Sequence, residues 1–489
     1  MAIIAREQYL KSIRAMRPNV WRNGELIEDL TTHPATKGII ESTARAYDAS
    51  NDPETATICT TTSKLTGEPI HRWNSLMQSL EDIIANSNFK RFSYRNTGTC
   101  TGATCVGWNA QNVMWAVTYE MDKDLGTNYQ ERLKNWLLKS QENGWAVAGA
   151  LTDAKGDRSM SPSQTENPDS NVRVKEVRPD GIVVSGVKAM ICGVEAANEI
   201  FILPGSAYKD PDADYAVAFV VPRDIEGLTI VGCRKPSDSR EFEEGWDKAV
   251  ETGTNSVYLI FEDVFVPNER VFMCRENKYT GKVITYFTAN YRAPIGACVA
   301  GQGDIMIGAS VLMARANGLS VKPFYDKIIQ MAINNETTYC MGIGAMACGY
   351  KHPSGIWISN SKLAHANKVH VATLPYETKR LCQEIGGGIV ETGCFPSYKD
   401  LTHPEIGPKL MKAVKASVNY SAETRARAAR LSEWLTVGAG IPGCMHGGGS
   451  PDGARMVVRA NTPIEEFAKQ AAKLCGITED VVDPAPKKK

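Results

Sequence analysis

The sequence predicts an α+β protein in which a β region lies between two helical regions. Residues 1–146 repeat apolar side chains at helical spacing, residues 147–275 hold short β-branched and aromatic runs, and helical spacing returns over 276–489. A chain of 489 residues exceeds one compact domain. We therefore expect an N-terminal helical domain, a middle β domain and a C-terminal helical bundle with these boundaries.

The first region carries four segments with apolar residues three and four apart, which is the spacing of one helix face. Gly144 follows the last of them and is expected to end that helix as its C-cap. The predicted helices cover residues 5–16, 71–89, 108–126 and 129–144.

The middle region alternates apolar and polar residues over 172–191 around the turn sequence "RPDG" at 178–181, which predicts a β-hairpin. Further short runs rich in Val, Ile, Phe and Tyr end at Pro, Gly or Asp and are expected to be strands. They cover residues 198–205, 214–222, 228–233 and 255–267.

The last region predicts helices over 294–318, 324–349 and 423–440. Pro294 suits the first turn of the first helix, where a missing backbone N–H costs nothing. "GIGAMA" at 342–347 matches a dinucleotide-binding fingerprint, but it lies within a helical pattern rather than after a strand. We therefore discount it.

The bulk composition excludes several classes of protein. Acidic and basic side chains number 55 each, so no overall field favours nucleic acid or an anionic membrane. Neither a charged-then-apolar leader nor a run of about 18 apolar residues is evident. We expect a soluble cytoplasmic protein, and the 13 cysteines are expected to be reduced thiols rather than a disulfide framework.

Two glycine-containing loops are candidates for ligand binding. Residues 151–164 place hydroxyl, carboxylate, ammonium and guanidinium groups around Gly156, which could bind an anionic or heteroaromatic ligand. "MHGGGS" at 445–450 places His446 before three glycines, and that imidazole could move a proton near neutral pH. The alternatives, a solvated turn and a flexible loop, stay open on composition alone.

Three cysteines raise the question of a metal centre. Cys100 and Cys105 are five positions apart, and on one helix they would diverge by about 140°. They can converge if "TGTCTG" is a loop, and Cys298 lies in another helical segment. Spacing alone permits three ligands of an iron–sulfur cluster, or three small core residues.

Several ordered motifs carry a family resemblance. "EQYLKSIR", "CVGWNAQNVMWAVTYEMDKDLGTNY", "TDAKGDR", "DGIVVSGVKA", "FEDVFVPNER", "NNETTYC", "LPYE" and "MHGGGSP" occur in this order along nearly the whole chain. With them the chain resembles the 4-hydroxyphenylacetate 3-hydroxylase family, and within it the 4-hydroxybutyryl-CoA dehydratase branch. The resemblance implies an acyl-CoA-dehydrogenase-like fold, bound FAD and a homotetramer.

The resemblance also implies which residues contact the flavin. They lie in two segments, the loop after residue 150 and the end of the hairpin strand. The implied flavin contacts are Leu151, Thr152, Asp153, Lys155, Gly156, Asp157, Arg158, Lys188, Ala189 and Met190.

The dehydratase branch holds a [4Fe–4S] cluster with three cysteines and one histidine, and this chain departs from that pattern. Cys105 and Cys298 match two ligand positions, whereas Cys100 is one residue upstream of the third. Tyr291 occupies the histidine position. The missing imidazole and the shifted spacing favour loss of the cluster, with Cys100, Cys105 and Cys298 as the ligands if one is bound.

The acid–base residues of that branch are also replaced. Its two glutamates align with Gly443 and Ser256, so we expect proton transfer by His446, Tyr291 or Tyr119 instead. The resemblance implies an FAD-dependent enzyme that acts on an acyl-CoA by dehydratase, isomerase or dehydrogenase chemistry. The alternatives are a phenol monooxygenase supplied by a separate flavin reductase, and a catalytically silent flavin- or CoA-binding subunit.

Overall fold

The computed structural model describes residues 3–154, 157, 159–233, 246, 251–437 and 447–479. The α-helices whose bounds the structure describes fall into a group before residue 144 and a group after residue 279. They are α1 (Arg6–Arg14), α2 (Lys37–Asn51), α3 (Ala56–Cys59), α4 (Leu80–Thr97), α5 (Val106–Leu125), α6 (Tyr129–Asn143), α8 (Thr280–Arg292), α9 (Ile295–Ala316), α10 (Tyr325–Ala347), α11 (Ser361–Val371), α12 (Leu374–Gly386), α13 (Gly388–Glu391), α14 (Tyr398–Thr402), α15 (Gly407–Val414), α16 (Ala422–Thr436), α17 (Pro451–Ala460) and α18 (Ile464–Cys475).

The described strands form two larger sheets and two short hairpins. The six-stranded sheet has the order β2-β1-β10-β11-β7-β6, and the four-stranded sheet has the order β12-β9-β8-β5. The strands are β1 (Val20–Arg22), β2 (Glu25–Ile27), β3 (Thr60–Thr62), β4 (Pro69–His71), β5 (Val147–Ala150), β6 (Arg173–Arg178), β7 (Gly181–Cys192), β8 (Glu199–Ile202), β9 (Val217–Pro222), β10 (Leu228–Gly232), β11 (Ser256–Pro267), β12 (Val271–Cys274), β13 (Tyr350–Lys351) and β14 (Trp357–Ile358).

The β region agrees with the prediction in detail. β6 and β7 are antiparallel and meet at Arg178 and Gly181, so the "RPDG" hairpin is confirmed. Each of the other predicted runs contains a strand, namely β8, β9, β10 and β11. The long β7 and β11 pair along most of their length, which makes them the centre of the six-stranded sheet.

The prediction of an all-helical first region was wrong at two places. β1 pairs in parallel with β10, so the N-terminal region adds two strands to the six-stranded sheet. Residues 71–79 are not α-helical: β4 runs to His71 and Arg72–Asn74 form one 3-10 turn. α4 begins only after Ser79, which caps it by accepting a hydrogen bond from the Asp82 N–H at 3.2 Å. Strands of three residues are too short to show a period of two in the sequence.

The helices elsewhere agree with the prediction. Gly144 caps α6 in the left-handed conformation, with φ of 59°, and Pro294 is the N-cap of α9. "GIGAMA" lies inside α10, as expected from its helical context.

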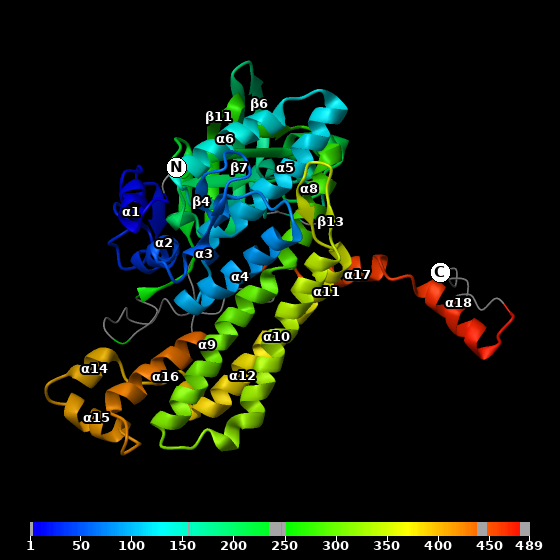
Figure 1. Ribbon diagram of the computed structural model, residues 1–489. Coiled ribbons are helices and arrows are strands. Elements are labelled where there is room, and N and C mark those ends of the chain that lie inside the picture. The colour runs from blue at the N-terminus through cyan, green and yellow to red at the C-terminus, as the bar shows by residue number, and fades with distance from the viewer. Residues whose placement is uncertain are drawn as a thin grey trace.

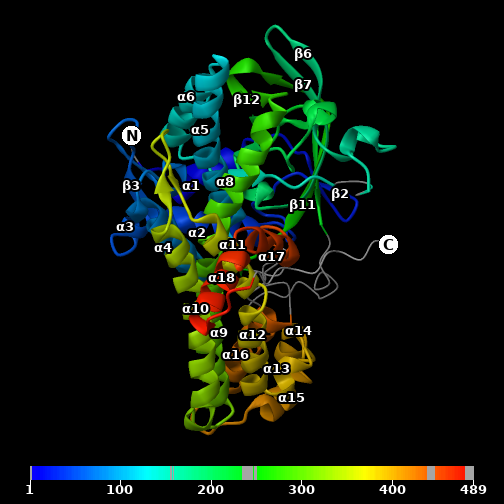
Figure 2. The same cartoon turned by 90° about the vertical axis from the view of Figure 1, so that its right-hand side faces the viewer.

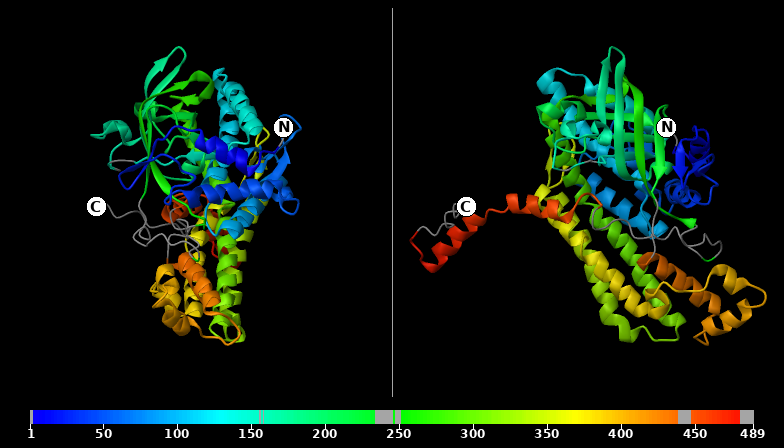
Figure 3. Two further views of the ribbon diagram at one scale, coloured as in Figure 1. Left: turned by 90° about the vertical axis from the view of Figure 1, so that its left-hand side faces the viewer. Right: turned by 180° about the vertical axis from the view of Figure 1, so that it is seen from behind.

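The layers of the molecule are visible in three views. In Figure 1 the two sheets and helices α5, α6 and α8 form the upper part, and the long helices α9, α10, α12 and α16 extend below it. Figure 2 shows α4, α9 and α10 as one column that runs from the sheets into the lower bundle. α17 and α18 project away from this body, which is clearest in the right-hand view of Figure 3. The largest core cluster runs from Tyr9 to Ala364 and joins the first helices, the sheets and α8.

Close backbone contacts at glycines fix the helices against the sheets. A methyl group on Gly107 of α5 would lie 2.1 Å from the carbonyl oxygen of Val147, so only glycine allows α5 to approach β5 so closely. A methyl group on Gly301 of α9 would lie 2.4 Å from the Arg91 carbonyl oxygen. α4 and α9 therefore pack with their backbones nearly in contact, and this places the start of α9 beside the end of α4.

One helical stretch, Asn277–Ala316, is long and apolar enough to cross a membrane by length and composition. Its mean hydropathy over the apolar window is 1.5, and 67% of that window is buried inside the protein. A helix buried in a protein core meets the same criterion, and most residues of the first half of α9 are buried.

Candidate functional site

The segment that follows β5 is tied to the end of β7 by main-chain and side-chain contacts. The Ala189 N–H donates to the Thr152 carbonyl at 3.0 Å, and the Ala154 N–H donates to the Val187 carbonyl at 3.2 Å. Asp153 and Lys188 form an isolated antiparallel bridge between the two segments. The structure therefore brings together the two stretches that the resemblance assigns to the flavin.

Lys188 and Asp153 form a buried ion pair. The Lys188 Nζ lies 2.7 Å from Asp153 Oδ1, with side-chain exposures of 2% and 1%. The same ammonium donates to the carbonyls of Leu151 and Leu203 at 2.9 and 2.8 Å. The Asp153 carboxylate also accepts from the Val172 N–H and the Tyr208 hydroxyl. This pair holds the shape of the loop, and its charged atoms face protein groups.

Met190 differs from the rest of β7 in its exposure and in its backbone conformation. It is the exposed residue of the otherwise buried or half-buried β7, with 64% of its surface accessible, whereas its neighbour Ala189 is buried. Its φ is +59°, a left-handed conformation that costs a non-glycine residue about 1–2 kcal/mol. The register between β7 and β11 shifts at this point, between Val257 and Leu259. An irregularity in the sheet therefore turns an apolar side chain outward beside the 151–154 segment.

The rest of the predicted flavin loop is partly outside the described residues. Lys155, Gly156 and Arg158 lie outside them. Asp157 is exposed and accepts hydrogen bonds from the N–H and the hydroxyl of Ser159 at 2.8 and 2.7 Å, which lower the pKa of its carboxyl. Its predicted flavin contact, like those of Leu151 and Thr152, stays a prediction.

The structure brings the three predicted cysteines together and adds a fourth. Cys100 lies in the loop after α4, Cys105 is the N-cap of α5, and Cys298 is in the first turn of α9. Burial and the neighbouring thiols Cys192, Cys105 and Cys298 raise the pKa of Cys100 well above its usual range. Cys192, the last residue of β7, was not predicted from the sequence.

The four thiols do not surround a single metal ion. Among the described residues, no group of three or more His, Cys, Asp or Glu side chains is arranged around one ion. None of the cysteines in the described part of the chain forms a disulfide bond. A polynuclear cluster holds its thiolates around several irons and so accepts a wider arrangement than one ion does. The described cysteines therefore form no mononuclear site, whereas four thiolates are the usual ligand set of a [4Fe–4S] cluster.

Tyr291 lies among these thiols. Its ring stacks on Phe287 at 5.4 Å between centroids, and Lys90 Nζ lies 5.2 Å from the ring centre. Burial, followed by Cys105, Cys100 and Cys298, raises the pKa of its phenol well above the usual value. The phenol is therefore protonated at neutral pH, and its hydroxyl can donate a hydrogen bond beside the thiols.

The glycine loop after residue 446 reaches the same place. A methyl group on Gly448 would lie 2.9 Å from two ring carbons of Tyr291, and Arg292 Nε donates to the Gly448 carbonyl at 2.8 Å. His446 and Gly443 lie outside the described residues, so the predicted role of His446 stays a prediction.

Tyr119 is not brought to the thiols. It lies 14 residues after Cys105 along α5, which corresponds to about 21 Å of helix. Its ring meets His352 edge-on at 6.2 Å. Its predicted role in proton transfer is untested, but it would have to act at the far end of α5.

Next to Tyr119 is a polar cluster that the sequence reading missed. Glu120 accepts from the Tyr286 hydroxyl and lies 2.9 Å from His352 Nε2 and 2.7 Å from Lys282 Nζ. Burial alone would raise the pKa of Glu120, but Lys282, His352 and Tyr286 outweigh it and lower that pKa. The available signal was an acidic residue directly after the apolar run "MWAVTY" of α5.

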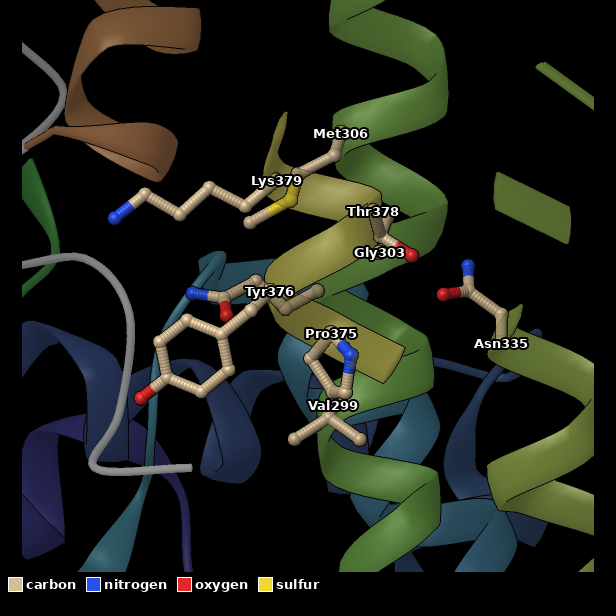
Figure 4. Close-up of a pocket in the computed structure, with 9 residues that line it drawn as sticks. Val299, Gly303, Met306, Asn335, Pro375, Tyr376, Thr378 and Lys379 are labelled. Carbon is tan, nitrogen blue, oxygen red and sulfur yellow. The ribbon is translucent and has the colours of Figure 1, made fainter. Parts of the chain in front are cut away.

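A solvent-open cleft lies beside the thiol group, between α9, α10 and α12 (Figure 4). It is a shallow cleft whose volume of about 300 Å³ includes open solvent, and its lining begins at Val299, the residue after Cys298. Tyr376 and Lys379 extend to one side of it and Asn335 stands on the other. The full lining is Val299, Gln302, Gly303, Met306, Asn335, Pro375, Tyr376, Thr378 and Lys379.

The chain is similar to known proteins over its whole length. It is 35% identical to the 4-hydroxybutyryl-CoA dehydratase/vinylacetyl-CoA-Δ-isomerase of Clostridium aminobutyricum, over 97% of this chain and 100% of that protein. It is 25% identical to the 4-hydroxyphenylacetate 3-monooxygenase oxygenase component of Thermus thermophilus, over 88% of each chain.

Solved structures agree with these relatives. An oxygen-tolerant archaeal 4-hydroxybutyryl-CoA dehydratase from N. maritimus superposes with a TM-score of 0.93 at 33% identity, over 100% of this chain and 98% of that one. The FAD complex of a 4-hydroxyphenylacetate 3-monooxygenase oxygenase component gives a TM-score of 0.81 at 21% identity, over 96% and 98% of the two chains, and shows the shared fold.

Two family models cover the chain almost end to end. The model described as 4-hydroxyphenylacetate 3-hydroxylase N terminal matches residues 5–273, which include the β5–β7 site and Cys100, Cys105 and Cys192. The model described as 4-hydroxyphenylacetate 3-hydroxylase C terminal matches residues 280–476, which include Tyr291 and Cys298. The mixed α and β fold, the site segments and both matches lead to one conclusion: this chain belongs to the 4-hydroxyphenylacetate 3-hydroxylase family.

Proposed function

We propose that this chain is an FAD-dependent enzyme that acts on an acyl-CoA-type substrate and has diverged from 4-hydroxybutyryl-CoA dehydratase. The observation that carries the proposal is the full-length similarity to that dehydratase, 35% in sequence and a TM-score of 0.93 in structure for its archaeal counterpart. The reaction class is dehydration, isomerisation or dehydrogenation at carbons near the thioester.

The residues present fit a flavin at the junction of β5 and β7. Met190 offers an exposed apolar surface at the end of a buried strand, where a flat ring could pack. Ala189 and Thr152 fix the main chain on either side. We propose that the 151–158 segment and Lys188–Met190 hold the flavin, with the Asp153–Lys188 pair as the support beneath them.

Bound FAD would supply the acceptance and return of electrons at the substrate carbons. The proton work then falls to the chain itself. Tyr291 is the candidate for moving a proton, because Phe287 and Gly448 pack against its ring and fix the phenol at the site. Ser256 cannot replace the glutamate of the dehydratase branch as a base, and this change argues for a substrate other than 4-hydroxybutyryl-CoA.

We propose that the cleft of Figure 4 receives the extended arm of the thioester. It opens to solvent between α9 and α12 and ends one residue from Cys298, so an acyl group entering there would approach the thiol group. Lys379 lines the solvent side and has the charge that suits the phosphates of a CoA.

We also propose the other features that the resemblance implies. They are an acyl-CoA-dehydrogenase-like arrangement of the fold, the three-part division at residues 146 and 275, a homotetramer in the cytoplasm, and a flavin reductase as partner if the chain is a monooxygenase. Sedimentation of the flavin-loaded protein tests the oligomeric state.

Anaerobic purification followed by an absorbance spectrum tests the flavin directly. Turnover is then measured against a panel of 4-hydroxyacyl-, 3-enoyl- and saturated acyl-CoAs, and separately against phenols with an added NADH-driven flavin reductase and oxygen. We expect flavin bands and turnover of an acyl-CoA. Turnover of phenols alone would establish the monooxygenase instead, and tight flavin binding without any turnover would establish the silent subunit.

A further inference from the structure

Four thiols from four separate segments of the chain meet at one place. They come from the loop after α4, the N-cap of α5, the end of β7 and the first turn of α9. Cys192 packs directly on Gly102, which lies in the loop between Cys100 and Cys105. Cys192 is therefore a full member of the group, although it lies on the β-sheet side.

Backbone packing holds Cys192 against the loop of the other thiols. A methyl group on Gly102 would lie 2.8 Å from the Cys192 carbonyl oxygen and 3.0 Å from its Cβ. A methyl group on Gly193, whose φ is +75°, would lie 2.3 Å from the Ala103 nitrogen. Two glycines on opposite segments thus let the end of β7 touch the loop between Cys100 and Cys105.

The surroundings are those of a buried site rather than of scattered core residues. Cys105 and Cys298 are each 7% exposed, and Tyr94 and Tyr291 lie close enough to be affected by the thiols. The Cys192 Sγ is 3.4 Å from the Ser256 Oγ, its partner across the β7–β11 pair. A protonated thiol is a weak hydrogen-bonding group, so hydrogen bonding alone does not account for four thiols in one buried region.

We propose that Cys192 is the fourth ligand of an iron–sulfur cluster bound by Cys100, Cys105 and Cys298, in the coordination position that the resemblance assigns to a histidine. Four thiolates are the usual ligand set of a [4Fe–4S] cluster. The proposal explains how the chain can lack the imidazole and yet retain the other ligands, because the strand carrying Met190 supplies a substitute two residues further on.

Full thiolate coordination would leave no iron position open to a substrate oxygen, so such a cluster would supply electron transfer rather than Lewis-acid activation. This inference concerns the iron ligands and stands or falls separately from the proposed flavin chemistry.

The test uses the full-length protein, purified without oxygen and reconstituted with ferrous iron and sulfide. Wild type is expected to bind about four irons and four sulfides per chain, with a broad charge-transfer absorbance and an electron paramagnetic resonance signal after reduction. Cys192→Ser is expected to lose at least half of the iron or to change that signal. Cys274→Ser, on β12 and outside the group, is the matched control and should bind iron as wild type does.

Protection from alkylation gives a second measurement that does not require a folded variant. In the reconstituted wild type, the four thiols should resist iodoacetamide while the exposed Cys340 and Cys394 react, as read by peptide mass spectrometry. A wild type that takes up no iron overturns the proposal. So does an iron-loaded protein in which Cys192 is alkylated, or a Cys192→Ser variant with wild-type iron content and signal. Flavin bands and acyl-CoA turnover, measured in parallel, report on the proposed function independently.

Discussion

Replacing Lys188 by methionine should destabilise the β5–β7 junction and release the flavin. Methionine retains the length and the apolar stem of lysine but removes the ammonium. The Asp153 carboxylate, 1% exposed, would then lie buried without its counter-ion, and the carbonyls of Leu151 and Leu203 would each lose a donor.

The size of the effect follows from these contacts. Breaking one side of a buried ion pair costs about 3–5 kcal/mol, because the remaining charge stays desolvated. An exposed pair in the same sheet provides the scale for comparison: Lys175 Nζ lies 2.5 Å from Asp263 Oδ1, with exposures of 37% and 66%. Pairs of that kind contribute about 0–1 kcal/mol. We therefore expect Lys188→Met to cost about 4 kcal/mol and Lys175→Met less than about 1 kcal/mol.

Thermal unfolding followed by circular dichroism measures the difference. A loss of about 4 kcal/mol corresponds to a fall in Tm of roughly 10 °C for a cooperative unit of about 200 residues. The double variant Lys188→Met/Asp153→Asn, which removes both charges, should recover about 2 kcal/mol relative to the sum of the single variants. Titration with FAD, followed by fluorescence, should show weaker binding for Lys188→Met. A Tm within about 2 °C of wild type, or equal effects at Lys188 and Lys175, would refute this reasoning.

Three further variants test the structure elsewhere. Burial lowers the pKa of His71 from the ordinary 6.5 to about 3, so between these values the unfolded chain binds more protons than the native protein. His71 therefore contributes stability above about pH 6.5, and this stability is lost as the pH falls toward 3, by up to about 1.4 kcal/mol per pH unit. His71→Gln should flatten the acid side of a plot of Tm against pH. An unchanged slope would contradict this assignment. Met190→Gly should relieve the strain of the left-handed backbone at this residue and leave the free energy of unfolding within about 1 kcal/mol of wild type. Titration with FAD should show weaker binding. Unchanged binding would remove Met190 from the flavin site. Gly107→Ala should lower the free energy of unfolding in urea by about 1–3 kcal/mol, because the added methyl group meets the Val147 carbonyl. Gly308→Ala is the control and should not lower it, because a methyl group there meets nothing within 4 Å. Similar losses at both glycines would count against close packing of α5 on β5.

Much of the fold could be predicted from local pattern. The hairpin at 178–181, the strands of the middle region and the long helices α5, α6, α9 and α10 have enough residues to display their period. The elements that were predicted wrongly are short, or their structure depends on a distant segment of the chain. β1 is three residues long and is a strand because β10 lies beside it, and residues 71–79 were assigned to a helix because β4 has no visible alternation.

The site could be predicted in part. The 151–158 and 188–190 segments were assigned to one ligand through resemblance, and the structure brings their described parts together. The roles within them could not be read from residue types, since Lys188 and Asp153 are charged residues that turn out to neutralise each other. Tyr119 and Tyr291 had equal standing in the sequence, but α5 separates Tyr119 from the thiols by about 21 Å.

The sequence by itself determined the strands of the middle region, the long helices and the family, and it pointed to three of the four thiols, because each of these is carried by periodicity or by residues in a fixed order. Tertiary structure alone decided that Cys192 joins Cys100, Cys105 and Cys298, that Met190 faces outward, and that Glu120 belongs to a separate polar cluster. The physical reason is that these relations depend on how β7, α5, α8 and α9 approach one another. That approach is set by backbone contacts at Gly102, Gly107 and Gly193 between segments far apart in the chain.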